Sequence, residues 1–211
     1  MAGSDGSVDP ITGDRASASA VHFKGIRHLA RQRYTPNKDA TSYRAELEGI
    51  YTTFRLCKEL GACGLSQICD NEEAVNKVKE DLTPKHMTSP EADIILACKE
   101  IMKEILPEPE LDWIRGHQDK KHKKKYEELP DKAQLNLDMD VECDEEQREG
   151  NQLEVTPLKG SGAMLSIDGR YITTNYNNNI QEAIMSKKHK KYFLEQYEKK
   201  GLTANGYNSI A

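Results

Sequence analysis

Hydrophobic and polar residues alternate weakly over residues 5–35, a pattern that predicts strands. The apolar positions form two runs on either side of Gly25, and this glycine favours a turn between them. Two further short apolar runs cover residues 64–69 and 111–115, and polar residues follow each of them. We predict a strand at each of these two runs.

Apolar residues spaced three or four apart predict two longer helices. One covers residues 47–60, with Ser42 as its N-cap and Gly61 at its end. The other covers residues 94–105, and Pro107 stops it.

Shorter amphipathic patterns predict helices at residues 72–82 and 133–146. In chain order the elements are strands, helix, strand, helix, helix, strand and helix. This order is typical of an α/β or α+β domain in which helices cover a mixed sheet.

The 211 residues are enough for one domain and an appendage, because a domain typically takes about 100–150 residues. We expect the domain to occupy residues 1–147 and a linker to occupy residues 148–162. Residues 163–211 carry an Asp-Gly hairpin signal and then a lysine-rich helical pattern at residues 180–200. We therefore expect a C-terminal appendage made of a hairpin and a helix.

The composition indicates an intracellular protein without a membrane anchor. No apolar run approaches the roughly 18 residues needed to cross a bilayer, and no charged-then-apolar leader opens the chain. The five cysteines are odd in number and form no CxxC pair, so reduced thiols are expected rather than disulfides or a zinc knuckle. The composition does not distinguish cytoplasm from nucleus.

The net charge of −5 is unevenly distributed. One lysine run surrounds His122 and a second surrounds His189, while acidic residues concentrate at 138–149. The two runs consist of Lys120, Lys121, Lys123, Lys124 and Lys125, and of Lys187, Lys188, Lys190 and Lys191. A basic patch on an acidic protein suits a polyanionic partner, and a solvated lysine loop is the alternative interpretation.

Two acidic residues stand where a carboxylate could bind a metal ion. Glu46 lies one helical turn before Ile50, on the apolar face of its helix, where a carboxylate is costly unless a metal ion or a lysine pairs with it. Asp70 ends a predicted strand, and ligands of α/β sheets gather at the carboxyl ends of strands. The alternative role for Asp70 is that of a helix N-cap.

Two more acids are less distinctive on their own. Asp140 lies four residues after Asn136 on one helix face, but the same helix carries many other acids. Asp5 stands beside Gly6 and could be a turn residue.

Five segments together resemble the type 1 ribonuclease H domain of reverse-transcribing mobile elements. The resemblance covers about residues 4–146, and the motifs occur in the family's order. The segments are Ser4-Asp5-Gly6-Ser7, Tyr43-Arg44-Ala45-Glu46, Asp70-Asn71, Trp113-Ile114-Arg115-Gly116-His117, and Asn136 followed after three residues by Asp140.

The resemblance implies a five-stranded mixed sheet with helices on both faces and hydrolysis of the RNA strand of an RNA–DNA hybrid. It implies that two Mg²⁺ ions, or Mn²⁺, are held by Asp5, Glu46, Asp70 and Asp140. His117 would assist proton transfer and product release, with His122 as a competing candidate. Asn71 would contact the substrate backbone, and the lysines at 120–125 would grip its phosphates.

The chain departs from the family at its start. The family's first carboxylate lies inside a central first strand, whereas only four residues precede Asp5 here. We therefore expect a truncated first strand, in a fragment of a longer polyprotein with a reverse transcriptase upstream or in a decayed gene copy.

Three hypotheses follow. The first is a magnesium-dependent nuclease acting on RNA–DNA hybrids. The second is a catalytically inactive remnant with the same fold that binds nucleic acid or acts only in assembly. The third is an acidic interaction domain whose carboxylates are surface residues, and convergence of the four acids on one point would exclude it.

Overall fold

The computed structural model describes residues 1–36, 40–81, 83, 90–119, 125–154, 158 and 165–199. The chain divides into two compact units, Met1–Met164 and Leu165–Ala211. Within the described residues, no helix is long and apolar enough to cross a membrane.

The first unit is built on a mixed sheet of six strands in the order β5-β4-β1-β2-β3-β6. Its strands are β1 (Ala2–Val8), β2 (Arg15–Phe23), β3 (Ile26–Tyr34), β4 (Ser66–Cys69), β5 (Glu110–Trp113) and β6 (Gln152–Leu153). The pairs β1–β2 and β2–β3 are antiparallel, and β1–β4, β4–β5 and β3–β6 are parallel. The predicted α/β class with a mixed sheet is confirmed.

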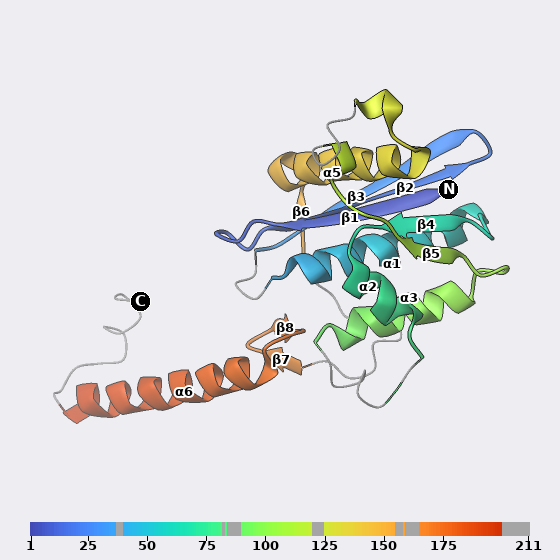
Figure 1. Ribbon diagram of the computed structural model, residues 1–211. Helices are drawn as coiled ribbons and strands as arrows, with labels where there is room; N and C mark the ends of the chain where they lie inside the picture. The colour runs from blue at the N-terminus through green and yellow to red at the C-terminus, as the bar shows by residue number, and fades with distance from the viewer. Residues whose placement is uncertain are drawn as a thin grey trace. The chain divides into compact units, whose positions relative to one another are not determined.

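Helices cover both faces of this sheet (Figure 1). Helices α1 (Ser42–Leu60), α2 (Glu72–Lys79) and α3 (Ala92–Lys103) pack on one face, and α5 (Asp131–Glu149) packs on the other. Apolar side chains on alternate strand positions therefore serve two cores. The α1 side buries residues such as Val21 and Ile50, and the α5 side buries Ala18 and Met139.

The N-cap of the first helix lies one residue earlier than predicted. Thr41, rather than Ser42, is the N-cap, and its side chain accepts a hydrogen bond from the Arg44 amide at 3.1 Å. Gly61 ends the helix in the left-handed conformation, as its position in the sequence predicted.

The first strand is short but fully paired around Asp5. It pairs with β2 over all seven residues, and Asp5 is the fourth of them. Strand β2 has nine residues, two more than β1. Its two extra residues lie beyond the pair of Ala2 with Val21, away from Asp5. The residues of β1 before and after Asp5 are therefore all paired with β2.

The segment expected to be a linker, residues 148–162, contributes to the first unit. Helix α5 continues to Glu149, and β6 then pairs with the end of β3 at Arg33 and Tyr34. The sheet thus has one strand more than the five expected. The pairing with β3 depends on distant residues, and a two-residue strand has too short a pattern to be found from sequence.

The second unit begins with the hairpin of β7 (Leu165–Ile167) and β8 (Arg170–Ile172). Its two turn residues, Asp168 and Gly169, both have positive φ, which is the requirement of a type I′ turn. Helix α6 (Tyr176–Lys199) follows. The described part of the second unit therefore contains the expected hairpin and helix.

Candidate metal centre

Helix α1 crosses β1 where only small residues fit. A side chain at Gly6 would overlap the helix backbone at Ala45 and Glu46, and one at Gly49 would lie 3.0 Å from the carbonyl oxygen of Asp5. Ser19 adds a hydrogen bond from its Oγ to the Gly49 carbonyl oxygen at 2.9 Å. The helix backbone therefore rests directly on the strand, which brings Glu46 beside Asp5.

We expect Gly6→Ala to lower the free energy of unfolding by about 1–3 kcal/mol, because its methyl group must push the helix off the strand. Gly49→Ala should lower it less, since its methyl would meet its nearest neighbours at 3.0 and 3.1 Å and alanine favours a helix by about 1 kcal/mol over glycine. Urea unfolding measures both. A Gly6→Ala variant as stable as wild type would contradict the close approach.

The parallel pairing of β4 with β1 brings Asp70 to the same place. Strand β4 ends at Cys69, directly before Asp70. The register pairs Gly3 with Ile68, and two residues further along the two strands it sets Asp5 level with Asp70. Asp70 thus stands at the carboxyl end of β4, where the sequence placed it.

Three of the four predicted carboxylates converge. Asp5, Glu46 and Asp70 each offer one oxygen, and these oxygens lie within 4.8 Å of one another. Asp5 and Glu46 are buried and Asp70 is partly buried. The three come from a strand, a helix and a strand end that are far apart in the sequence.

Burial and mutual repulsion make this cluster unstable as three anions. Burial, followed by the negative charges of Asp70 and Asp140, raises the pKa of Asp5 to about 8. Burial and the charges of Asp5 and Asp70 raise the pKa of Glu46 well above its usual range, and burial raises that of Asp70. At neutral pH the cluster must therefore keep protons or take up a cation.

The donor set fits a hard divalent cation. All three ligand atoms are carboxylate oxygens, which suit Mg²⁺ and Mn²⁺ better than softer metals. The neighbouring Cys69 donates from Sγ to Glu46 Oε2 at 3.5 Å, and burial raises the pKa of its thiol well above the usual range. Sequence patterns had not assigned this thiol to the site.

Asp140 lies near this cluster but outside it. Its Oδ2 is 3.1 Å from Nδ1 of His117, and both side chains are partly exposed. Its charge still contributes to the raised pKa values of Asp5 and Glu46. The predicted fourth carboxylate and the predicted histidine are therefore close to each other, at the exposed edge of the site.

Three residues without an assigned role lie against Asp70, and two of them make hydrogen bonds to it. Asn136, buried on α5, makes a hydrogen bond with its carboxylate, and Trp113 donates from Nε1 to its carbonyl oxygen at 3.0 Å. A side chain at Gly116 would collide with the Asp70 carboxylate. Each of the three occurs in a quoted motif, but only the folded contacts show what it does.

Asn71, and not Asp70, caps α2. The Asn71 side-chain oxygen accepts from the Ala74 amide at 3.0 Å, so the alternative role of Asp70 as an N-cap is wrong. The capping oxygen of Asn71 is thereby occupied. The contact of Asn71 with a substrate backbone stays a prediction.

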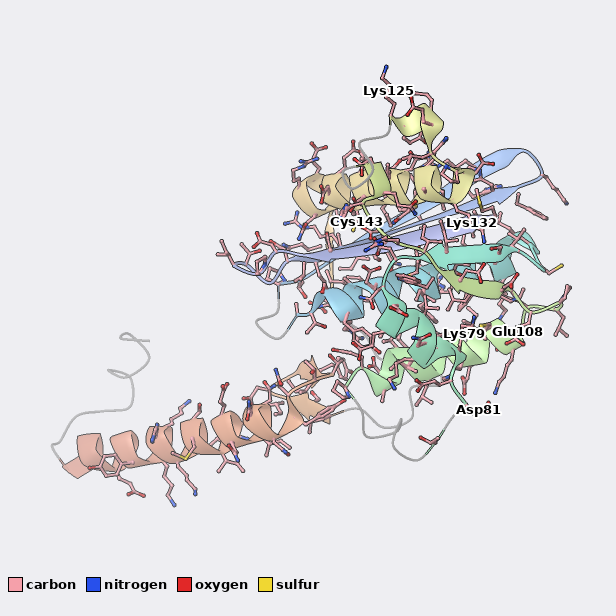
Figure 2. All side chains as sticks on the ribbon, in the orientation of Figure 1. Lys79, Asp81, Glu108, Lys125, Lys132 and Cys143 are labelled. Atoms are coloured by element: carbon pink, nitrogen blue, oxygen red, sulfur yellow. The ribbon has the colours of Figure 1, made fainter. Side chains whose placement is uncertain are left out.

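Most of the predicted lysine loop lies outside the described residues. This applies to Lys120, Lys121, Lys123 and Lys124 and to the competing histidine, His122. Lys125 is exposed next to the short helix η2 (Tyr126–Glu128), and Figure 2 shows its side chain pointing outward.

A buried network of charges fixes the first turn of α1, two residues from Glu46. Arg44 donates to Glu48 at 3.0 Å, to Glu91 at 2.5 Å and to both oxygens of Asp93 at 2.8 and 2.9 Å. Arg15 of β2 also pairs with Glu48, at 2.9 Å. The helix start is therefore tied to α3 and to β2 through side chains that are almost fully buried.

An open groove adjoins the site along α5. Its volume is about 550 Å³, and its walls include the acids Asp119, Asp138, Asp140 and Asp144. A phosphate backbone in this groove would meet repulsion unless cations screened it.

The chain matches no protein-family model and no curated protein sequence. It is similar in structure to the N-terminal RNase H domain of Rv2228c from Mycobacterium tuberculosis (13% identity, 56% of this chain and 90% of that one, TM-score 0.45). It is also similar to RNase H1 from Halobacterium salinarum NRC-1 (14% identity, 54% and 83%, TM-score 0.42). A third similar structure is LC11-RNase H1 in complex with an RNA/DNA hybrid (15% identity, 56% and 86%, TM-score 0.43). At these identities and TM-scores the similarity says nothing of function, which has to be inferred from the chain's own residues.

Proposed function

We propose that this chain is a magnesium-dependent endonuclease that hydrolyses the RNA strand of RNA–DNA hybrids, as part of a retroelement-derived protein. One observation carries the proposal. Asp5, Glu46 and Asp70 come from three of the ordered motifs, and their oxygens lie within 4.8 Å of one another. Asp5 and Glu46 are buried, whereas the hypothesis of a plain acidic interaction domain requires carboxylates at the surface.

The three clustered carboxylates would hold the metal, with Asp140 at the exposed edge. Divalent ions bound there would lower the pKa of an attacking water and stabilise the leaving oxygen of the phosphodiester. The thiol of Cys69 contacts Glu46, but burial raises its pKa well above the usual range, so it is a poor nucleophile at neutral pH. The carboxylates fix the ligand positions, and Trp113 and Asn136 hold Asp70 among them.

His117 is the residue that we assign to proton transfer. It follows β5 with a positive φ of 48°, which turns the residue away from the strand direction, and more than half of its side chain is exposed. Its Nδ1 faces Asp140 at 3.1 Å, an arrangement that orients the ring and leaves Nε2 for the reacting groups.

A non-catalytic nucleic-acid-binding protein with the same fold is the second candidate. The observation in its favour is Asp140, which pairs with His117 instead of joining the other three carboxylates. This protein would bind a hybrid but would not cleave it.

A cleavage assay separates the two candidates. A hybrid with a labelled RNA strand is incubated with the full chain and Mg²⁺, with single-stranded RNA and duplex DNA as control substrates. The proposal expects cleavage of the RNA strand of the hybrid alone and its loss in EDTA. A folded chain that binds the hybrid without cutting it would support the second candidate instead.

Metal binding should stabilise the protein more at high pH than at low pH. The pKa of Asp5 is raised from 3.8 to about 8, so the metal-free native state retains a proton that the unfolded chain releases. The proton on Asp5 contributes to the stability of the folded state at low pH, and this contribution is lost as the pH rises from about 4 to about 8. A metal ion must displace the proton, and displacement is easiest once the pH exceeds the folded pKa.

We therefore expect the rise in Tm caused by MgCl₂ to be larger at about pH 9 than at about pH 6. Thermal unfolding with NaCl at the same ionic strength is the control for screening. Asp5→Asn should remove most of the pH dependence. Equal rises in Tm at both pH values would contradict the assignment of Asp5 to the metal site.

A further inference from the structure

The second unit carries charge of the opposite sign to the first. Residues 165–211 contain seven lysines or arginines and four aspartates or glutamates, whereas residues 1–164 contain 23 and 31. A nuclease unit with excess negative charge and an acidic groove beside its site has little of its own charge with which to hold a polyanion. The positive excess of the chain therefore resides in the appendage.

The positive charge is concentrated on one stretch of α6. Lys187, Lys188, Lys190 and Lys191 are all exposed, and no acidic residue occurs between Glu182 and Glu195. Within the part of the chain that the structure describes, none of these four lysines has an ion-pair partner. Their charges are thus presented to solvent and available to a ligand.

We propose that this lysine face of α6 binds the phosphate backbone of the nucleic acid on which the first unit acts. The inference rests on the proposed function for the identity of the nucleic acid. The four lysines occupy about 6 Å of the helix axis, or roughly one positive charge per 1.5 Å. Double-stranded DNA carries one negative charge per about 1.7 Å, so the two charge densities match.

The distribution of apolar residues favours a nucleic acid over a membrane surface. A helix that lies on a membrane separates an apolar face from a cationic one. In α6 the exposed Ile180 and Ile184 precede Lys188 at successive intervals of four, so these apolar residues and this lysine share one side of the helix. The described side chains of α6 therefore do not form the separate apolar face that a membrane surface requires.

The test replaces the four lysines Lys187, Lys188, Lys190 and Lys191 with glutamine in the full chain. Glutamine keeps helix propensity and removes the charge, and circular dichroism checks that the helix is retained. Binding of a fluorescent RNA–DNA hybrid is followed by anisotropy in EDTA, so that cleavage plays no part. A matched variant replaces four exposed lysines of the first unit, Lys24, Lys58, Lys79 and Lys103, with glutamine.

We expect the α6 variant to bind at least about tenfold more weakly at low salt. The slope of log K against log salt should be smaller in magnitude by about 2–4. The matched variant should remain within about twofold of wild type. Equal binding by wild type and the α6 variant would overturn the inference, and so would equal weakening of both variants, which would indicate bulk charge.

The same proteins distinguish this inference from the proposed function. Cleavage by wild type together with unchanged binding by the α6 variant would overturn the inference and leave the nuclease in place. Hybrid binding through α6 without any cleavage would support the inference and contradict the nuclease. Vesicles containing an anionic lipid are the last arm, and binding to vesicles but not to the hybrid would overturn the inference.

Discussion

Asp70→Asn will reduce cleavage of the RNA strand by about 10³-fold or more and leave the protein folded. A loss of this size is typical when a group that contacts the reacting atoms is removed. Asp70 contributes one of three oxygens that lie within 4.8 Å of one another, and the asparagine side chain offers no negative charge to the metal. Removal of one anion from this crowded set also relieves repulsion, because the charge of Asp70 raises the pKa of both Asp5 and Glu46.

Single-turnover cleavage and thermal unfolding of the same variant measure both effects. Asp81→Asn, at an exposed aspartate just after α2 that Figure 2 labels, is the matched control and should cleave like wild type. Asp140→Asn should lose less activity than Asp70→Asn, since Asp140 lies outside the cluster and beside His117. The proposed function is wrong if Asp70→Asn cleaves at more than about a tenth of the wild-type rate.

Arg44→Met will lower the free energy of unfolding by about 3–5 kcal/mol, the cost of removing one partner from a buried ionic network. The guanidinium of Arg44 reaches Glu48, Glu91 and both oxygens of Asp93, and these side chains are almost fully buried. Without Arg44, the buried carboxylates of α1 and α3 have too little positive charge beside them to offset their burial.

The control for Arg44→Met lies on the same helix. Arg55 pairs with Glu59 at 3.2 Å, and about half of each side chain is exposed. Arg55→Met should therefore change the free energy of unfolding by at most about 0.5 kcal/mol. Urea unfolding of the two variants makes the comparison, and similar losses in both would show that the Arg44 network is not a major source of stability.

Local patterns in the sequence were sufficient for several parts of the fold and site. Residues 47–60 have a regular helical period, so their helix and its end at Gly61 could be predicted. Asp70 follows a short apolar run, which placed it at a strand end. The convergence of Asp5, Glu46 and Asp70 was expected from the resemblance, since no local rule links three such distant segments.

Other features depend on contacts between distant segments and left no local signal. The Arg44 network joins residues 15, 44, 48, 91 and 93, and only Arg44 and Glu48 have a local relation, the i,i+4 spacing of a helix. The strand β6 is two residues long and exists only because β3 offers it an edge. The pairing of Asp140 with His117 depends on how a loop after β5 meets α5, which the many acids of α5 did not reveal.

The composition of β1 has a consequence for how the chain folds. Its sequence, Ala-Gly-Ser-Asp-Gly-Ser-Val, contains one large apolar side chain, so the strand has little hydrophobic area with which to hold itself in place. Its hairpin partner β2 is adjacent in sequence, but its other neighbour, β4, follows about 60 residues later. During synthesis on the ribosome, β1 remains an open sheet edge until residues 66–69 have emerged and docked. Asp5 and Glu46 are both synthesised before Asp70, and the docking of β4 that closes this edge also brings Asp70 to the other two carboxylates.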